Sequence, residues 1–270
     1  MAAIVGASFG ALWPAHGVCA EESMPPDHPM MRDRFVLGVG VSRTESSVTA
    51  SLNDSGSGLG SIIDFEDDLG LDRNNVIAVL TFGMRVGDRW RLDVEYFTLN
   101  RDNVEHVDRT LDWGRLSIPL NATIRSNFNV EDIRVSVGYS FFRRTDKEVG
   151  VGLGAHVMSL DATVSADDFG RQNASVNSAP LPVFIFYARM ALTDRWLLNM
   201  RGERLSLDTG DIDGSIFNSE VDFVYQPWRH FNVGVGYRDI NLEVTSSDET
   251  WRGKAQVRQN GPMLFVSSTF

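Results

Sequence analysis

The stretch "WRLDVEYFT", residues 90–98, alternates apolar and charged side chains with a period of two. Successive side chains of a β-strand point to opposite faces, so this period predicts a strand with one apolar and one charged face. The apolar positions are Trp90, Leu92, Val94 and Tyr96, and the charged positions are Arg91, Asp93 and Glu95. Residues 217–225 follow the same rule, so the chain contains several strands of this kind.

Other strand-like segments carry glycine where these two carry charge. The runs around Gly38, Gly152 and Gly234 read "GVG" or "GLG", with Val, Leu or Phe at the alternate positions. Glycine weakens a strand, so its recurrence on one face indicates strong curvature or bulky neighbours that fill the space above it. Closure of a narrow barrel would provide both.

Counting the strand-like segments gives ten, with eight and twelve as the alternatives. They are residues 34–49, 75–87, 89–102, 122–142, 147–161, 180–193, 195–207, 214–226, 229–243 and 252–270. The connections alternate between two kinds. Short polar turns, such as "GDRW" (87–90) and "TDRW" (193–196), lie on one side, and the longer connections 50–74, 103–121, 162–180, 208–213 and 244–250 lie on the other. One short-turn end and one long-loop end are typical of outer-membrane barrels.

The composition excludes several classes of protein. The net charge of -11 argues against a nucleic-acid partner, because the Lys and Arg residues are scattered and form no basic patch. Beyond the first residues, no apolar run is long enough for a transmembrane helix. The apolar start of the chain, followed by small residues before Glu21, predicts a signal peptide over residues 1–20. We therefore expect three parts: the signal peptide, a periplasmic segment 21–33, and a barrel over 34–270.

The chain finishes with "GPMLFVSSTF" (261–270), an alternating strand that ends on Phe270. This ending resembles the C-terminal strand of bacterial outer-membrane proteins, in which a terminal aromatic residue is part of what the assembly machinery recognises. Together with the alternation and the loop asymmetry, it makes almost the whole mature chain similar to the small bacterial outer-membrane β-barrels, the superfamily of OmpA-, OmpX- and OmpW-like proteins. The resemblance implies an all-β, antiparallel, up-and-down transmembrane β-barrel.

In such a barrel the apolar set faces lipid and the charged set faces the lumen. A soluble barrel would have the reverse arrangement, which is the alternative. Trp90, Trp196 and Trp228 all fall at short turns, where interface aromatics belong, and Phe270 joins them. Because a ten-stranded barrel is narrow, we expect the inward charges to form a paired network that fills the lumen. The expected network is Arg85, Asp93, Glu95, Arg134, Arg189, Arg201, Glu203, Glu220, Asp222 and Arg238, with His156 and Arg258 also predicted to point inward.

The first long connection contains "SIIDFEDDLGLDRNN" (61–75), which combines five carboxylates with apolar residues. A calcium site is one interpretation, but the order of ligands found in an EF-hand is absent. The spacing of its apolar residues favours a short amphipathic helical segment that acts as a lid over the barrel mouth and pairs with Arg43, Arg101 or Arg238. The predicted lid residues are Asp64, Phe65, Glu66, Asp67, Asp68, Leu69 and Leu71.

Catalytic chemistry has weaker support in the sequence. His106 lies near Glu105, Asp108 and Asp112 in the second long connection and would suit an omptin-like rim site, but a solvated loop histidine is the simpler interpretation, and the omptin pattern cannot be matched residue by residue. His156 and His230 have no serine in a convincing relation for a lipid A deacylase-like site. We therefore assign no catalytic residue, metal or cofactor.

The expected function is a structural or surface-interaction role in the cell envelope, or restricted passage of small solutes. A barrel enzyme of the omptin-like or deacylase-like kind is the alternative. The expected partners are outer-membrane lipid, lipopolysaccharide and the barrel-assembly machinery, and we expect a monomer in the outer membrane of a Gram-negative bacterium.

Overall fold

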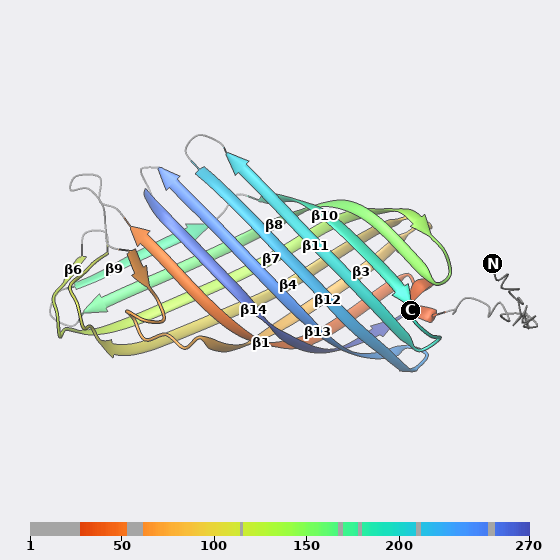
Figure 1. The fold of residues 1–270 in the computed structure, drawn as a ribbon, viewed down its shortest axis with the longest axis horizontal. Helices are drawn as coiled ribbons and strands as arrows, with labels where there is room; N and C mark the ends of the chain where they lie inside the picture. Colours follow the sequence, from red (N-terminus) through yellow and green to blue (C-terminus); the bar gives the residue numbers. More distant parts are fainter. Residues whose placement is uncertain are drawn as a thin grey trace, which may run out of the picture.

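The computed structural model describes residues 28–52, 62–113, 116–166, 170–177, 180–208, 212–247 and 252–270. The expected signal peptide lies outside these residues. Ten antiparallel strands form a closed ring in the order β10-β11-β12-β13-β14-β1-β3-β4-β7-β8, and β8 pairs with β10 to close it (Figure 1). The ring strands are β1 (Phe35–Leu52), β3 (Asn74–Val86), β4 (Trp90–His106), β7 (Thr123–Arg143), β8 (Lys147–Ala166), β10 (Leu181–Ala191), β11 (Trp196–Asp208), β12 (Ile212–Trp228), β13 (Phe231–Ser247) and β14 (Arg252–Thr269). The prediction of a ten-stranded, antiparallel, up-and-down barrel is confirmed.

In the described residues, four short strands and one turn of 3-10 helix lie outside the ring. At the long-loop end these are β2 (Ile62–Asp64), β5 (Leu111–Trp113), β6 (Leu116–Ile118) and β9 (Gly170–Asn177), and at the short-turn end η1 (Pro29–Met31). The expected amphipathic helix in the first long connection is wrong: residues 62–64 pair with β1, and residues 65–69 form a turn. Backbone pairing with β1 supplies the hydrogen bonds that a short helix would otherwise leave unmade. No helix in the described ranges is long and apolar enough to cross a membrane.

The apolar set of each ring strand faces outward. Leu37, Leu153 and Phe184, for example, are all more than half exposed on the outer surface. The aromatic residues Trp90, Trp196, Trp228 and Phe270 are exposed at the short-turn end. Arg258 is an exception to the predicted set of inward charges, because it is exposed on the outer surface of β14. It lies one residue from Gln259, which is buried, so the assignment was off by one position along the strand.

Glycines on the inner face make room for large side chains from neighbouring strands. A Cβ at Gly150 would lie 2.2 Å from the ring of Tyr187, and one at Gly234 would lie 2.1 Å from the ring of Phe265. The phenol of Tyr187 therefore lies flat over the backbone of β8. This is the arrangement that the glycine repeat predicted, and it lets a narrow barrel hold aromatic side chains.

Candidate functional site

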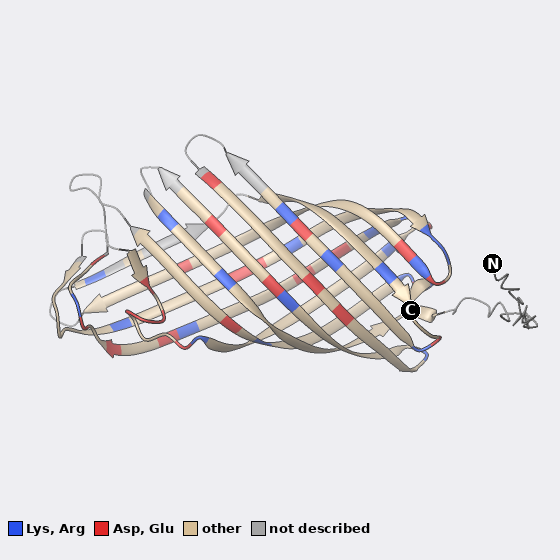
Figure 2. Ribbon diagram, in the orientation of Figure 1, with Lys and Arg blue, Asp and Glu red and all other residues tan. Residues whose placement is uncertain are grey.

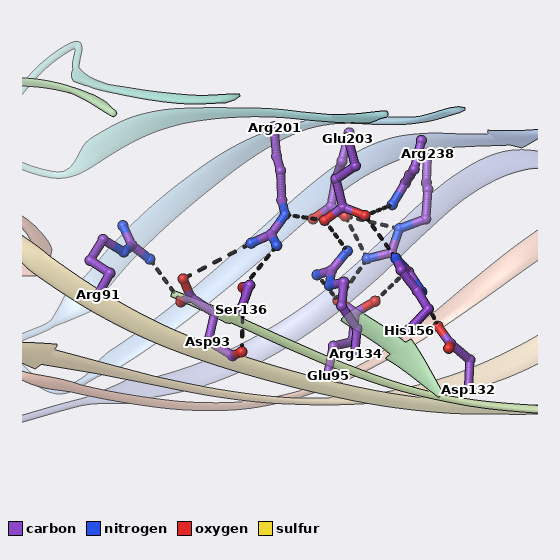
Figure 3. A network of polar contacts seen from close by, with 12 residues as sticks. Arg91, Asp93, Glu95, Asp132, Arg134, Ser136, His156, Arg201, Glu203 and Arg238 are labelled. Carbon is purple, nitrogen blue, oxygen red and sulfur yellow. Dashed lines mark hydrogen bonds and ion pairs between the residues drawn. The ribbon is translucent and has the colours of Figure 1, made fainter. Parts of the chain in front are cut away.

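The middle of the lumen is crossed by ion pairs that connect opposite walls of the barrel (Figure 3). Glu95 on β4 lies between two arginines. Its Oε2 accepts from Arg134 Nη2 at 2.9 Å, and its Oε1 accepts from Arg238 Nη1 at 2.7 Å. Arg238 also contacts Glu220 through Nε at 2.9 Å. These pairs join β4, β7, β12 and β13, so they brace the ring across its interior.

Glu203 is the centre of a second cluster at the same level. Its Oε1 lies 2.6 Å from Arg201 Nε and 3.0 Å from Arg134 Nη1. Its Oε2 lies 3.1 Å from His156 Nε2, and the other ring nitrogen of His156 lies 2.8 Å from Asp132 Oδ2. With a carboxylate at each nitrogen, the imidazole has no free nitrogen with which to activate a nucleophile.

A third cluster lies nearer the short turns and centres on Glu148. This fully buried carboxylate accepts from Arg85 Nη2 at 2.7 Å and from Ser140 Oγ at 2.5 Å. Arg189 and Arg91 approach it at 3.6 and 4.0 Å. Three arginines thus share one carboxylate, and Asp93, which pairs with Arg91 at 3.0 Å, supplies further negative charge. Figure 2 shows these charges as alternating blue and red positions along the strands.

A cavity of about 180 Å³ lies between these clusters. Arg91, Asp93 and Arg201 line it on its polar side, and Met30 and Phe265 contribute to its apolar side. It is large enough to hold several water molecules. Arg91, Asp93 and Arg201, which face this cavity, are 16–24% exposed, whereas Glu148 and Glu203 are fully buried.

The long-loop end of the lumen is closed by residues 62–73. The carboxylate of Glu66 is buried there: Oε1 lies 2.5 Å from Arg101 Nη1, and Oε2 accepts from the backbone N–H of Val48 at 2.8 Å. Burial raises the pKa of the Glu66 carboxyl, against the opposing effects of the Val48 and Arg101 contacts. Glu66 therefore fixes this segment to two strands of the ring, β1 and β4.

The apolar residues of the same segment fill the barrel mouth. Phe65, Leu69 and Leu71 are at most 2% exposed. They form one continuous apolar core with the inward-facing side chains of the ring strands near the long-loop end. The Phe65 ring meets that of Phe128 edge-on, with ring centroids 5.2 Å apart. Asn103 Nδ2, on β4, donates to the carbonyls of Leu69 and Gly70 at 3.1 and 2.8 Å. These hydrogen bonds attach the C-terminal end of the turn to β4.

The remaining carboxylates of this segment organise the turn or pair at its surface. Asp64 Oδ1 accepts from the backbone N–H groups of Glu66 and Asp67, at 3.0 and 2.9 Å. Asp67 pairs with Arg73, and Asp68 pairs with Arg109. Arg101 is thus the one predicted lid partner that contacts the segment among the described contacts. Arg43 is exposed on β1, and Arg238 pairs within the lumen.

The short-turn end is closed by the segment that precedes β1. Met30 and Met31 insert into the barrel mouth and pack with Ala191, Leu197 and Val224. The backbone carbonyl of Met31 accepts from Arg143 Nη2 at 2.8 Å. Two further contacts hold the segment: Asp33 accepts two hydrogen bonds from Arg229, at 2.6 and 2.8 Å, and His28 Nδ1 accepts from the N–H of Met30.

The ten residues expected in the lumen all lie on its inner face. Asp222 differs from the others because it forms no ion pair within the described part of the chain, and it packs against Gly236. Two further carboxylates of the lumen, Glu148 and Asp132, are absent from the set predicted from the sequence. Their positions could have been found, because each has the parity of inward neighbours: Glu148 precedes Gly150 and Gly152, and Asp132 precedes Arg134.

Among the described contacts, the side chains of the other two candidate histidines meet uncharged groups. His106 Nδ1 contacts Thr123 Oγ1 at 3.0 Å, at the long-loop rim. His230 Nδ1 contacts the carbonyl of Thr269 at the short-turn end. In the part of the chain that the structure describes, no group of three or more His, Cys, Asp or Glu side chains is placed to hold a metal ion.

Comparison with known proteins gives the fold. No protein-family model matches the sequence, and no curated protein matches it. Among solved structures, the chain is similar to the outer-membrane protease OmpT of Escherichia coli, with a TM-score of 0.57 and 10% identity, over 88% of this chain and 97% of that one. The Pseudomonas putida toluene transporter TodX is also similar, with a TM-score of 0.37 and 10% identity over 91% and 93% of the chains. The Yersinia pestis attachment invasion locus protein Ail has a TM-score of 0.35 and 10% identity over 88% and 99%.

The similarity to OmpT covers nearly the whole of both chains. At 10% identity it shows the fold and carries no activity to this protein. The chain therefore has the fold of the bacterial outer-membrane β-barrels.

Proposed function

We propose that this protein is an integral barrel of a Gram-negative outer membrane, with a structural or surface-interaction role in the envelope. The exposed apolar face of the ring strands supports a lipid environment, because a soluble protein rarely exposes so continuous an apolar surface. By the usual asymmetry of these barrels, the short turns face the periplasm and the long loops face the exterior.

The observation that carries the structural role is the closure of the lumen at both ends. The Phe65–Leu71 segment fills the outer mouth, Met30 and Met31 fill the periplasmic mouth, and ion pairs cross the space between them. An open pore needs a continuous aqueous path, which these contacts interrupt. The long strands beyond the apolar band would then present the connections at the cell surface.

Planar-bilayer recording tests the closed lumen. The purified protein should insert but give no steady conductance. A variant with both closures weakened, Phe65→Ala and Leu69→Ala with Met30→Ser and Met31→Ser, should show a small conductance limited by the ion pairs that still cross the lumen, whereas Ile62→Ala, an exposed position in the same segment, should remain silent. Steady current from the unmodified protein would contradict the closed-lumen role.

The central cavity favours restricted passage of small solutes as a second candidate. A space of about 180 Å³, lined by both apolar and charged side chains, lies between the two closures and would hold a small solute. Uptake of radiolabelled solutes of increasing size into proteoliposomes distinguishes the two roles. Uptake with a sharp upper size limit would support passage, and no uptake at any size would leave the structural role.

A location in the outer membrane implies a set of partners. We expect insertion by the barrel-assembly machinery, contact with lipopolysaccharide around the outer half, and a monomeric state. Heat-modifiable migration on a gel tests the folded barrel, because an intact barrel migrates faster before boiling than after it. Fractionation of the native host would test the outer-membrane location directly.

A further inference from the structure

Arginine and aromatic side chains occur as neighbours at every short turn of the barrel. The doublets are Arg34-Phe35 before β1, Arg89-Trp90 before β4, Phe142-Arg143 at the end of β7, Arg195-Trp196 before β11, and Trp228-Arg229 at the end of β12. All five aromatic side chains are exposed on the outer surface. Because the ring is closed, these doublets are distributed around its whole circumference at one level.

The same end of the barrel is basic although the chain is acidic. Residues 32–34, 87–89, 143–147, 192–195 and 227–230 contain eight Lys or Arg and four Asp, a net of +4, against -11 for the whole chain. Figure 2 shows blue segments gathered at the turns near the C-terminus. This concentration of positive charge is local, since the rest of the chain must carry a net of -15.

Several of these arginines have guanidinium groups that are not neutralised by the barrel itself. Arg34, Arg144 and Arg195 are exposed and form no ion pair with any described residue. Arg144 lies over the ring of Phe142, with its Cζ 5.4 Å from the ring centroid, so its charge is held beside an outward-facing aromatic side chain. By contrast, Arg229 already pairs with Asp33.

We propose that this basic collar, defined by Arg34, Arg144 and Arg195 with their neighbouring aromatics, binds the anionic headgroups of phospholipids in the periplasmic leaflet. The inference rests on the proposed membrane placement. Aromatic side chains settle at the level of the lipid carbonyls, and an adjacent arginine then reaches the phosphate level without leaving the barrel wall. Phosphatidylglycerol carries a net negative charge there, whereas zwitterionic headgroups offer less net attraction.

Tryptophan quenching by brominated lipids measures this binding, because Trp90, Trp196 and Trp228 lie beside the collar. The protein is reconstituted into vesicles that contain brominated phosphatidylglycerol or brominated phosphatidylcholine, and quenching gives the relative binding constant of the two lipids. We expect phosphatidylglycerol to be preferred. Replacing all three collar arginines (Arg34→Gln, Arg144→Gln and Arg195→Gln) should weaken the preference by about tenfold or more, given the attraction of each basic side chain to an anionic surface.

The matched control replaces three exposed arginines on the outer surface nearer the other end, Arg43→Gln, Arg204→Gln and Arg258→Gln. It should retain the preference for phosphatidylglycerol at the collar tryptophans. Heat-modifiable migration of all variants confirms that the barrel is folded, and flotation of the protein with the vesicles confirms membrane insertion, so a failed collar is distinguishable from a failed barrel. The proposal is overturned if folded wild-type protein shows no preference, or if the two triple variants lose it equally. It is also overturned if the collar variant keeps its lipid preference but no longer sediments with isolated peptidoglycan, which would assign the collar to the cell wall.

Discussion

Glu66 Oε1 and Arg101 Nη1 lie 2.5 Å apart at the barrel mouth, and both side chains are only 1% exposed. This pair connects the first long connection to β4. The Arg101 guanidinium also lies over the ring of Phe128, 5.0 Å from its centroid, so it is held by an aromatic side chain as well as by a carboxylate. The closure of the mouth therefore depends on a buried charge pair that sits within an apolar cluster.

Replacing Arg101 by Met should release this closure. The substitution leaves the Glu66 carboxylate buried without its partner, which typically costs about 3–5 kcal/mol. The matched control is Arg73→Met, because the Arg73–Asp67 pair is exposed, at 42% and 72%, and such pairs contribute roughly 0–1 kcal/mol. Limited proteolysis between residues 62 and 73 measures the difference. Equal cleavage rates in the two variants would contradict the role of the buried pair.

The stability of the closed segment should also depend on pH, and the direction of this dependence follows from the pKa of Glu66. Because burial raises the pKa of this carboxyl, the closed segment binds the proton more tightly than an open, solvated segment would. The closed state is therefore favoured below the ordinary glutamate pKa and loses that advantage as the pH rises through the raised value. Proteolysis of residues 62–73 by an acid-tolerant protease should accelerate over this window.

Glu66→Gln provides the control for this pH dependence. The amide does not titrate but keeps nearly the same shape, so the acceleration should disappear. If the variant retains the same pH profile as the wild type, Glu66 is not the group that sets the pH dependence of the closure.

Removing the central carboxylate of the lumen should weaken the whole barrel. In Glu95→Gln, Arg134 and Arg238 lose their shared carboxylate and keep only Glu203 and Glu220 as partners, so we expect a loss of about 3 kcal/mol, the low end of the cost of breaking a buried ion pair. Glu131→Gln is the control, because Glu131 lies on β7, the strand that carries Arg134, but its side chain is exposed. The measurement is the temperature at which the fast-migrating folded band converts to the slow one. An unchanged temperature for Glu95→Gln would show that the cross-lumen pairs do not brace the ring.

The contact between Tyr187 and Gly150 can be tested with a single methyl group. A Cβ at position 150 would lie 2.2 Å from the phenol ring, so Gly150→Ala should destabilise the barrel by about 1–3 kcal/mol through overpacking. Gly202→Ala is the matched control, because nothing lies within 4 Å of its Cβ position. The temperature of band conversion should fall for the first variant alone. Tyr187→Leu should restore part of the loss in the Gly150→Ala background.

The strands and their two faces follow from the local order of residues alone. Alternation with a period of two is a local property, so residues such as Trp90, Asp93 and Glu95 reveal both the strand and the direction of each side chain. The glycine repeat likewise indicated curvature and bulky neighbours, and Tyr187 over Gly150 is such a neighbour. Arg258 was predicted to point into the lumen but faces outward, because the predicted positions on this strand were shifted by one residue. With a period of two, such a shift moves every side chain to the opposite face.

Which charges meet, and how the two ends close, depends on contacts between segments that are far apart in the chain. Glu95 and Arg238 are 143 positions apart in the chain and pair because ring closure brings their strands to opposite walls at one level. The carboxylates of residues 61–75 could have paired with any arginine near the mouth, and the spacing suggested a helix. Pairing with β1 instead places Glu66 against Arg101, because register between strands is fixed by contacts that no single segment contains.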